Sequence, residues 1–331
     1  MISTKAFKAY DIRGIVPSEV NEDLAYRLGR ALAWKLQAKE LVVGHDIRLS
    51  GPALSEAAVK GMRDAGANVQ DLGQCGTEMI YFATAHLKTD GGMMITASHN
   101  PKDYNGMKLV RSEARPISAD TGLKDLAELV AAEDFETRVP KAAEQGTYKK
   151  VDIVPSYVDH LLSYINVKSL LPLKIVANPG NGGAGPIVKE LAKHLPCQFI
   201  MINDTPDGTF PNGVPNPLLP ENRAATSDAV KKNGADLGIA WDFDRFFFFD
   251  ENGRFIEGYY LVGLFAQYFL QKHPGSKILY DPRLTWNTED IIARYDGQPV
   301  RCKSGHAFIK ECMRRQGVLY GGEMSAHHYF R

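Results

Sequence analysis

The chain has 331 residues, of which 44% are apolar and 24% are charged, with 39 basic and 39 acidic side chains. This length and composition predict a globular protein of two or three domains. The zero net charge argues against a nucleic-acid or membrane-surface protein, which would show a basic face, although a few local cations can still bind a small anion.

The cysteines and the apolar runs narrow the class of protein further. The four cysteines are scattered without a C-x-x-C pair, which excludes a zinc ribbon and a disulfide framework and fits a reducing compartment. The longest apolar stretch, residues 259–270, contains Gln267 and is too short to span a bilayer. The N-terminus has no apolar signal core, because Lys5 and Lys8 interrupt it. We therefore expect a cytoplasmic protein.

The first predicted strand is the apolar run at residues 41–46, which ends in a polar turn. A helix is predicted after it, because apolar residues lie three to four apart between residues 54 and 65 and Ser50 can cap its start. A short strand near Val69 follows. This strand–helix–strand order predicts a βαβ unit.

A second apolar run, residues 92–95, leads into residues 96–101, with the sequence TASHNP. The Asn-Pro pair stops regular structure, because proline lacks an N–H and restricts the residue before it. Ser98 is therefore predicted on a loop at the carboxyl end of a buried strand, the usual place for ligand chemistry in open α/β sheets. With His99 beside it and Lys108 close behind, its hydroxyl is a candidate phosphoryl carrier or acyl nucleophile. The alternative is a tight turn with local hydrogen bonds.

The same order of elements recurs twice more along the chain. Apolar runs at residues 174–179 and 277–282 end in polar turns, and helical patterns begin near residues 186 and 287. Strands that alternate with helices predict α/β units with mostly parallel sheets. We therefore predict three consecutive similar α/β domains with mixed, mostly parallel sheets, over residues 1–148, 149–252 and 253–331.

An acidic loop closes the second unit. The apolar strand at residues 237–240 delivers Asp242, Asp244 and Arg245. In an extended loop residues i and i+2 point the same way, so both carboxylates could bind one hard cation such as Mg²⁺. A solvated acidic turn is the alternative. The apolar residues 246–249 that follow favour a rigid platform.

A third polar loop follows the predicted strand at residues 318–320. It carries Glu323, Ser325 and His327, which suit hydrogen bonding to sugar hydroxyls, and a polar C-terminal tail is the alternative. His306 precedes a predicted helix and is a candidate anion-binding or acid–base group, or an ordinary helix start. Three such loops in successive similar units predict an interdomain cleft with one loop from each domain.

On these residues the chain resembles the α-D-phosphohexomutases, the phosphomannomutase and phosphoglucomutase family. Residues 96–101 look like the family's phosphoserine loop, residues 242–245 like its metal loop and residues 322–327 like its sugar-recognition loop. Residues 9–14 and 303–306 match the family as well. The resemblance extends over essentially the whole chain.

The resemblance implies a mutase reaction with mobile phosphoryl groups. Phosphorylated Ser98 would phosphorylate a hexose 6- or 1-phosphate, the resulting hexose 1,6-bisphosphate would turn over in the cleft, and the opposite phosphate would return to the serine. Mg²⁺ bound by phosphorylated Ser98, Asp242 and Asp244 would neutralise charge during transfer, and hexose 1,6-bisphosphate would be the activator. The implied catalytic residues are Ser98, Lys108, His306 and Arg245, and the implied substrate-binding residues are Tyr10, Arg13, Arg283, Glu323, Ser325 and His327.

Two departures from the family pattern lower the expected activity. The family's metal loop has three alternating aspartates, whereas only Asp242 and Asp244 precede Arg245 here, as though two residues were missing. The family also has a fourth domain that binds the phosphate not being transferred, and this chain stops at Arg331, before that domain could begin. We therefore expect weak Mg²⁺ binding and impaired turnover.

The resemblance and the departures leave several functions to compare. Residues 322–331 and 280–287 are most similar to family members that make mannose 1-phosphate for GDP-sugars, so we predict interconversion of mannose 6-phosphate and mannose 1-phosphate. The alternatives are a phosphoglucomutase and an inactive phosphosugar-binding protein. A serine hydrolase is disfavoured, because no G-x-S-x-G elbow surrounds Ser98. The expected partners are phosphosugars, with neither nucleic acid nor membrane.

Overall fold

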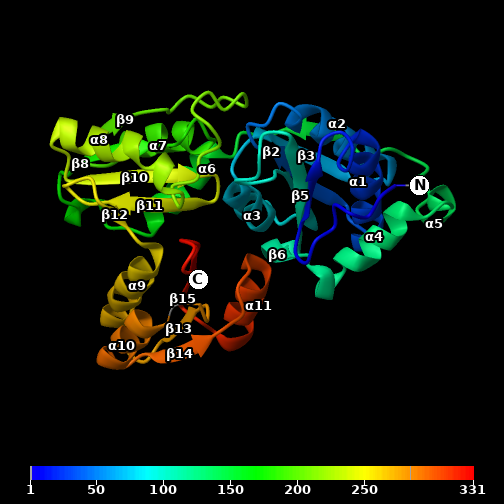
Figure 1. The fold of residues 1–331 in the computed structure, drawn as a ribbon. Coiled ribbons are helices and arrows are strands. Elements are labelled where there is room, and N and C mark those ends of the chain that lie inside the picture. Colours follow the sequence, from blue (N-terminus) through cyan, green and yellow to red (C-terminus); the bar gives the residue numbers. More distant parts are fainter. Residues whose placement is uncertain (1, 284) are drawn as a thin grey trace. The chain divides into compact units, whose positions relative to one another are not determined.

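The computed structural model describes residues 2–283 and 285–331. Its strands form three sheets, and the chain divides into two compact units (Figure 1). The first unit comprises Met1–Leu170, Asn181–Leu195 and Thr205–Val214, and the second comprises Leu171–Gly180, Pro196–Asp204 and Pro215–Arg331. The first unit contains one sheet and the second contains two.

The sheet of the first unit has parallel strands at its centre and antiparallel strands beside them. Its strands are β1 (Ile12–Ile15), β2 (Glu40–His45), β3 (Asn68–Gln74), β4 (Gly91–Ile95), β5 (Tyr104–Arg111), β6 (Arg115–Pro116) and β7 (Tyr148–Lys150). The order is β1-β5-β4-β2-β3-β7, and β6 pairs with β5. β2 is parallel to β3 and β4, whereas β5 is antiparallel to β1 and β4. This arrangement confirms the predicted mixed α/β sheet.

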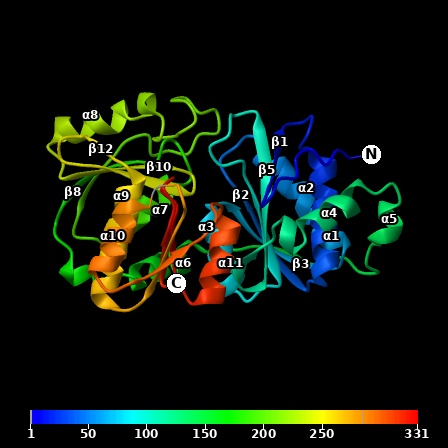
Figure 2. The ribbon, with the colours of Figure 1, turned by 60° about the horizontal axis from the view of Figure 1, so that its bottom comes forward.

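Two hydrophobic cores lie on opposite faces of this sheet. The helices of the first unit are α1 (Glu22–Leu36), α2 (Gly51–Asp64), α3 (Thr77–His86), α4 (Leu123–Ala131), α5 (Phe135–Arg138), α6 (Val154–Ser163) and α7 (Ala184–Ala192), with 3-10 turns η1 (Ser112–Ala114), η2 (Ala119–Thr121) and η3 (Val167–Ser169). Leu41 and Val43 of β2 pack with α1, α2 and α4, while Val42 packs with α3. Figure 2 shows α1 and α4 on one side of β5 and α3 on the other.

The start of α2 differs from the local prediction. Ser50 precedes the helix, but its side chain makes no capping hydrogen bond. Its hydroxyl oxygen instead accepts a hydrogen bond from Nδ2 of Asn105, at 2.9 Å. Asn105 on β5 is fully buried, and a buried amide needs a partner. A contact between residues distant in sequence therefore replaces the expected local cap.

The first sheet of the second unit has β10 and β8 as neighbouring inner strands. Its strands are β8 (Lys174–Asn178), β9 (Gln198–Met201), β10 (Leu237–Asp242), β11 (Arg245–Phe249) and β12 (Phe255–Ile256), in the order β12-β11-β10-β8-β9. β8 is parallel to β9 and β10, and β11 is antiparallel to β10. The 3-10 turn η4 (Pro220–Asn222) precedes α8 (Ala224–Asn233), whose Val230 packs with Val176 and Phe249.

The second sheet of the second unit repeats the pattern in a smaller form. Its strands are β13 (Lys277–Tyr280), β14 (Gln298–Arg301), β15 (Tyr320–Gly322) and β16 (His328–Phe330), in the order β14-β13-β15-β16, and its helices are α9 (Gly258–Lys272), α10 (Trp286–Arg294) and α11 (His306–Gln316). Ile278 and Tyr280 face α9 and α10, whereas Leu279 packs with residues of α11. The strand predicted at residues 318–320 begins at Tyr320.

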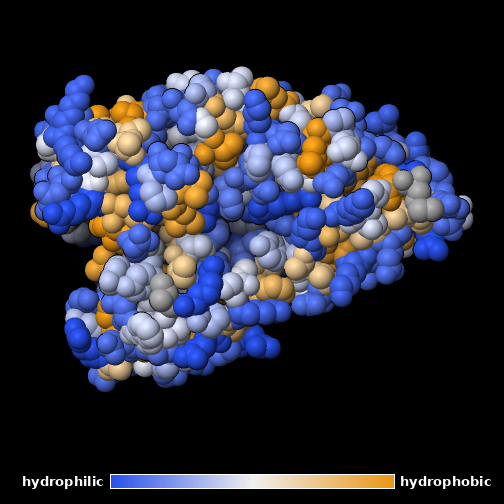
Figure 3. All heavy atoms as spheres, in the orientation of Figure 1, coloured by the Kyte–Doolittle hydropathy of each residue, from blue (hydrophilic) through white to orange (hydrophobic). Residues whose placement is uncertain are grey.

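The visible surface carries mostly hydrophilic side chains, with small hydrophobic groups between them (Figure 3). Among the large exposed hydrophobic residues, Trp34 and Leu49 come from separate segments, whereas Tyr260, Leu264 and Tyr268 lie on the single helix α9. None of the helices in the described residues is long and apolar enough to cross a bilayer.

Candidate active site

The Ser98 loop, residues 96–103, joins β4 to β5 in the first unit. It begins where Ile95 ends the strand, and the Thr96 N–H donates to the Gly106 carbonyl at 2.9 Å. Ser98 is 3% exposed and has a φ of +52°, a left-handed conformation that costs a non-glycine residue about 1–3 kcal/mol. Its Oγ lies 3.4 Å from Nδ1 of His99. The serine thus lies at the carboxyl end of a buried strand in a strained backbone.

The N-terminal segment brings Tyr10 and Arg13 to the Ser98 loop. Arg13 of β1 donates from Nη1 to Oδ1 of Asn100, at 2.7 Å. Tyr10, Arg13 and Asn100 line one cavity of about 450 Å³. The close pairing of β1 and β5 depends on Gly106, since a Cβ there would lie 1.8 Å from the Ile12 carbonyl oxygen. Two predicted substrate-binding residues therefore lie beside the predicted phosphoserine loop.

Lys108 returns to this region through the β4–β5 pair. It lies on β5 opposite Met94 and is 4% exposed. Lys108 lies two positions after Gly106. The Gly106 carbonyl accepts the hydrogen bond from the Thr96 N–H at the start of the Ser98 loop. Because alternate strand residues point to the same face, Lys108 and Gly106 share one face of β5.

Sequence analysis did not select Arg48, which also contacts the Ser98 loop. Its guanidinium donates to backbone carbonyl groups of the loop, Ser98 among them. The sequence does contain a pattern that could have indicated Arg48. An Asp-x-Arg pattern follows β2 at residues 46–48 and recurs after β13 at residues 281–283. In both copies the arginine N–H donates to Oδ1 of the aspartate, at 2.9 and 3.0 Å.

The Asp242–Arg245 hairpin joins β10 to β11 in the second unit. Only Phe243 and Asp244 separate the two strands, so the extended loop predicted here is wrong and a tight turn takes its place. Both carboxylate oxygens of Asp242 accept from Arg245: Nε donates to Oδ1 at 2.9 Å, and Nη2 donates to Oδ2. Asp242 is fully buried, and burial raises its pKa to about 7 against the opposing effect of Arg245.

His327 lies between two carboxylates in the loop after β15. Its Nδ1 is 3.3 Å from Oε2 of Glu323, and its Nε2 is 3.8 Å from Oδ1 of Asp244. Burial favours the neutral ring, but the hydrogen bonds to Asp244 and Glu323 outweigh it and raise the pKa of His327. Ser325 Oγ is 3.3 Å from the same Nδ1. The predicted Glu, Ser and His set thus lies together, next to the hairpin.

Arg283 and His306 complete this cluster. Nη2 of Arg283 is 3.5 Å from Oε1 of Glu323 and 3.4 Å from Oγ of Ser325. His306 is the first residue of α11, and the preceding Gly305 N–H donates to Oε1 of Glu323 at 3.0 Å. The second unit therefore brings together Asp242, Asp244, Arg245, Arg283, Glu323, Ser325, His327 and His306, whereas Tyr10, Arg13, Ser98 and Lys108 belong to the first unit.

The carboxylates of the hairpin do not form a ready Mg²⁺ site. Mg²⁺ requires several oxygen ligands in near-octahedral geometry, and both oxygens of Asp242 are already paired with Arg245. Asp244 faces His327. In the described part of the chain, no group of three or more His, Cys, Asp or Glu side chains is arranged to bind a metal ion. The donor set as folded does not fit the cation that the resemblance implies.

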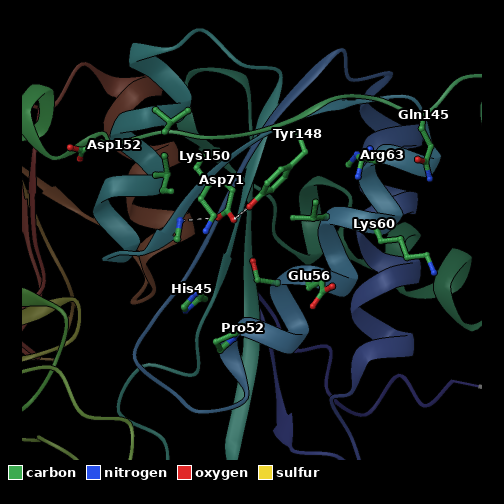
Figure 4. Close-up of a pocket in the computed structure, with 15 residues that line it drawn as sticks. His45, Pro52, Glu56, Lys60, Arg63, Asp71, Gln145, Tyr148, Lys150 and Asp152 are labelled. Atoms are coloured by element: carbon green, nitrogen blue, oxygen red, sulfur yellow. Dashed lines mark hydrogen bonds between the residues drawn. The ribbon is translucent and has the colours of Figure 1, made fainter.

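A larger groove of about 910 Å³ lies elsewhere in the first unit, between α2 and the β3–β7 edge (Figure 4). Tyr148 donates to Asp71 there at 2.8 Å, and burial together with this hydrogen bond raises the pKa of Tyr148 to about 12. Lys60 and Lys150 also line the groove. None of the predicted site residues is among the lining residues, so volume alone does not mark the predicted site.

Family models match nearly the whole chain. They are described as the α/β/α domains I, II and III of phosphoglucomutase/phosphomannomutase, and they match residues 4–137, 155–253 and 257–331, respectively. Each match contains one of the three sheets, apart from the edge strands β7 and β12.

Individual proteins of this kind are similar over the same length. A protein described as "Phosphohexose mutases" from Xanthomonas campestris pv. campestris is 61% identical over 98% of this chain and 72% of its own length. The phosphomannomutase of Salmonella typhimurium is 58% identical over 100% of this chain and 74% of its own. The crystal structure of a phosphoglucomutase/phosphomannomutase family protein from Burkholderia thailandensis is 34% identical, with a TM-score of 0.92, over 100% of this chain and 73% of that chain.

Proposed function

Because this chain belongs to the phosphoglucomutase/phosphomannomutase family of phosphohexomutases, which are isomerases, we propose that it interconverts mannose 6-phosphate and mannose 1-phosphate. The relatives named phosphomannomutases support mannose as the sugar. The observation that carries the proposal is Ser98, a buried serine in a strained backbone at a strand end, with Arg13 and His99 beside it. The product would supply GDP-sugar synthesis in the cytoplasm, and the four free cysteines fit such a reducing compartment.

The proposed chemistry moves a phosphoryl group between Ser98 and the sugar. The sugar hydroxyl oxygen attacks phosphorus on phosphorylated Ser98, and the bond from phosphorus to the serine Oγ breaks. The hydroxyl proton passes to His306 or Lys108, and a proton returns to the serine Oγ, so that the serine hydroxyl is regenerated. A hexose 1,6-bisphosphate results. It turns over, and the reverse step returns its opposite phosphoryl group to Ser98. Hexose 1,6-bisphosphate added from outside would load the serine at the start.

The cluster in the second unit is suited to bind the sugar phosphate. Glu323 is 3% exposed and already accepts hydrogen bonds from the Gly305 N–H and the Tyr329 hydroxyl, at 3.0 and 2.7 Å, so its carboxylate is held in one orientation. Its neighbours His327 and Arg283 offer donors for a phosphate or for hydroxyl oxygens. We propose that Glu323 and Ser325 bind the sugar hydroxyls and that Arg283 and His327 bind beside them.

Charge on the transferring group is assigned to protein cations in this proposal. Arg245 and Lys108 are both at most 4% exposed, and cations in such surroundings act more strongly on a phosphoryl group than exposed ones. Because Asp242 is paired with Arg245, no step is assigned to Mg²⁺.

One observation favours the second function, phosphosugar binding without turnover. Arg245 donates two hydrogen bonds to Asp242, so only its remaining N–H groups are left to bind a phosphoryl group. In this case Ser98 would accept phosphate, but the sugar phosphates would not interconvert.

Two measurements on the same preparation distinguish the two functions. The protein is incubated with mannose 1,6-bisphosphate, and peptide mass spectrometry locates any added phosphate. The same preparation is then assayed for conversion of mannose 1-phosphate to mannose 6-phosphate by a coupled reaction, with glucose 1-phosphate in parallel. Phosphate on Ser98 with conversion of mannose 1-phosphate supports the mutase. Phosphate on Ser98 without conversion supports the binding protein, and no phosphate on Ser98 refutes the mutase.

A further inference from the structure

We propose that Arg48 is the positioning residue of the Ser98 loop: its guanidinium binds four backbone carbonyl groups and thereby keeps Ser98 in the conformation that accepts a phosphoryl group. The inference rests on the proposed role of Ser98 as phosphoryl carrier. It concerns a side chain that contacts the loop backbone and has no assigned contact with substrate.

The contacts of Arg48 follow the course of the loop. Nη2 donates to the carbonyl oxygens of Ser98 and Asn100, both at 2.6 Å. Nη1 donates to those of Pro101 and Tyr104, at 2.6 and 2.9 Å. One planar guanidinium thus binds carbonyl groups from Ser98 to Tyr104, the first residue of β5. A lysine ammonium, which is a compact charge on a flexible side chain, cannot reproduce this arrangement.

A second chain of hydrogen bonds links Arg48 to the amide of Ser98. Oδ2 of Asp46 lies 3.4 Å from Nε of Arg48 and accepts from the Thr96 hydroxyl at 2.6 Å. The Thr96 Oγ1 in turn accepts from the Ser98 N–H at 2.9 Å. Ser98 is therefore held at its carbonyl by Arg48 and at its amide by Thr96. Holding both sides of a residue is what a strained, left-handed φ of +52° requires in order to persist.

The guanidinium is sealed from water by a distant segment of the first unit. Arg48 is 1% exposed, and its Cζ lies 5.4 Å from the centre of the Phe210 ring. Gly208 makes this approach possible, because a Cβ there would lie 2.2 Å from the Ile47 carbonyl oxygen. Water cannot readily replace the arginine at the four carbonyl groups, so losing it leaves buried acceptors without donors.

The test compares Arg48→Lys with a matched variant, Arg30→Lys. Arg30 is also fully buried in the first unit, pairs with Glu136 at 2.8 Å and lies 5.2 Å from the Phe135 ring centre, yet it belongs to α1 and not to the Ser98 loop. Each protein is assayed at a temperature where circular dichroism shows it folded. We measure the rate of phosphate incorporation at Ser98 from mannose 1,6-bisphosphate, and amide hydrogen exchange over residues 96–105.

The positioning role predicts that Arg48→Lys exchanges about tenfold faster over residues 96–105 and incorporates phosphate about tenfold more slowly at saturating bisphosphate, whereas Arg30→Lys changes both by less than about twofold. Equal effects of the two substitutions, or unchanged exchange in Arg48→Lys, would overturn the proposal. If the unaltered protein incorporates no phosphate, the proposed function fails, and the exchange comparison still decides whether Arg48 holds the loop. If Arg48→Lys does not fold, Arg48→Gln is compared with Arg30→Gln by the same two measurements.

Discussion

The Ser98 loop and the Asp242–Arg245 hairpin both follow a buried strand, and in each a buried arginine donates hydrogen bonds to oxygen atoms. In the Ser98 loop, Arg48 binds backbone carbonyl groups, and the polar side chains of Ser98 and His99 remain side by side. In the hairpin, Arg245 binds the side chain of Asp242 with two of its donors. The arginine therefore holds the backbone beside the proposed phosphoryl acceptor in the first loop and pairs with a carboxylate in the second.

This difference shows that a polar motif at a strand end does not define its own chemistry. The decisive feature is what the neighbouring cation binds. Arg48 directs Nη1 and Nη2 to backbone carbonyl groups and meets a carboxylate only at Nε, 3.4 Å from Oδ2 of Asp46. Arg245 instead places Nε and Nη2 on the two oxygens of Asp242, which leaves fewer lone pairs of that carboxylate for a metal ion.

The largest expected effect is that of replacing Ser98, the central residue of the first loop. Ser98→Ala removes the only proposed phosphoryl acceptor, so incorporation of phosphate from mannose 1,6-bisphosphate should fall to background, with unchanged far-UV circular dichroism. The measurement is mass spectrometry of the labelled protein. Ser118→Ala, another buried serine of the first unit, serves as the control and should label normally. Labelling that survives in Ser98→Ala would remove the serine from the mechanism.

The hairpin is expected to contribute mainly to stability. Arg245→Met leaves the fully buried Asp242 without its partner, which should cost about 3–5 kcal/mol of unfolding free energy. Arg138→Met breaks an ion pair with Asp134 whose side chains are 53% and 57% exposed, and it should cost less than about 1 kcal/mol. Urea titrations of both variants measure the difference. Comparable losses would contradict the view that Arg245 is needed to neutralise Asp242.

A smaller effect concerns His328, which ties the hairpin strand β11 to β16. Its ring stacks on Phe246 at 5.1 Å, and its Nδ1 lies 2.7 Å from the Tyr320 hydroxyl. Burial and then the nearby His327 lower the pKa of His328 to about 3, against a smaller opposing effect of Glu323.

The sign of the pH dependence follows from that lowered pKa. Below the ordinary histidine pKa of 6.5, His328 binds a proton in the unfolded chain but not in the folded chain. Its contribution to the free energy of unfolding is therefore complete above pH 6.5 and is lost as the pH falls toward 3. Between pH 6.5 and 5 this amounts to about 2 kcal/mol. His328→Phe should lack this part of the loss in urea titrations at both pH values. An identical pH dependence in the variant would argue against a neutral buried ring.

The smallest expected effect is that of Mg²⁺. With Asp242 paired to Arg245, we expect the unphosphorylated protein to bind Mg²⁺ with a Kd of roughly 1 mM or weaker, because the ion would have to displace a guanidinium and keep most of its waters. Isothermal titration calorimetry, with Asp244→Asn as the comparison, measures this affinity. Micromolar binding that Asp244→Asn abolishes would show that the hairpin opens for the metal.

The sequence by itself determined the three α/β units and the family. Apolar runs such as residues 92–95 and 237–240 are continuous local signals of strands, and the polar residues that follow them lie at strand ends. The motifs around Ser98, Asp242 and Glu323 are contiguous in the chain, so they could be found without coordinates. The family matches confirm both conclusions.

Only the tertiary structure decided which partner each polar group takes. Ser50 meets Asn105 instead of capping its helix, Asp242 pairs across a hairpin with Arg245, and Arg48 binds carbonyl groups up to 56 positions away in the sequence. Burial makes an unpaired polar group costly, so each group takes the donor or acceptor that the packed chain brings within reach. Spacing along the sequence carries no record of that choice, because it depends on contacts between distant segments such as the approach of Phe210 to Arg48.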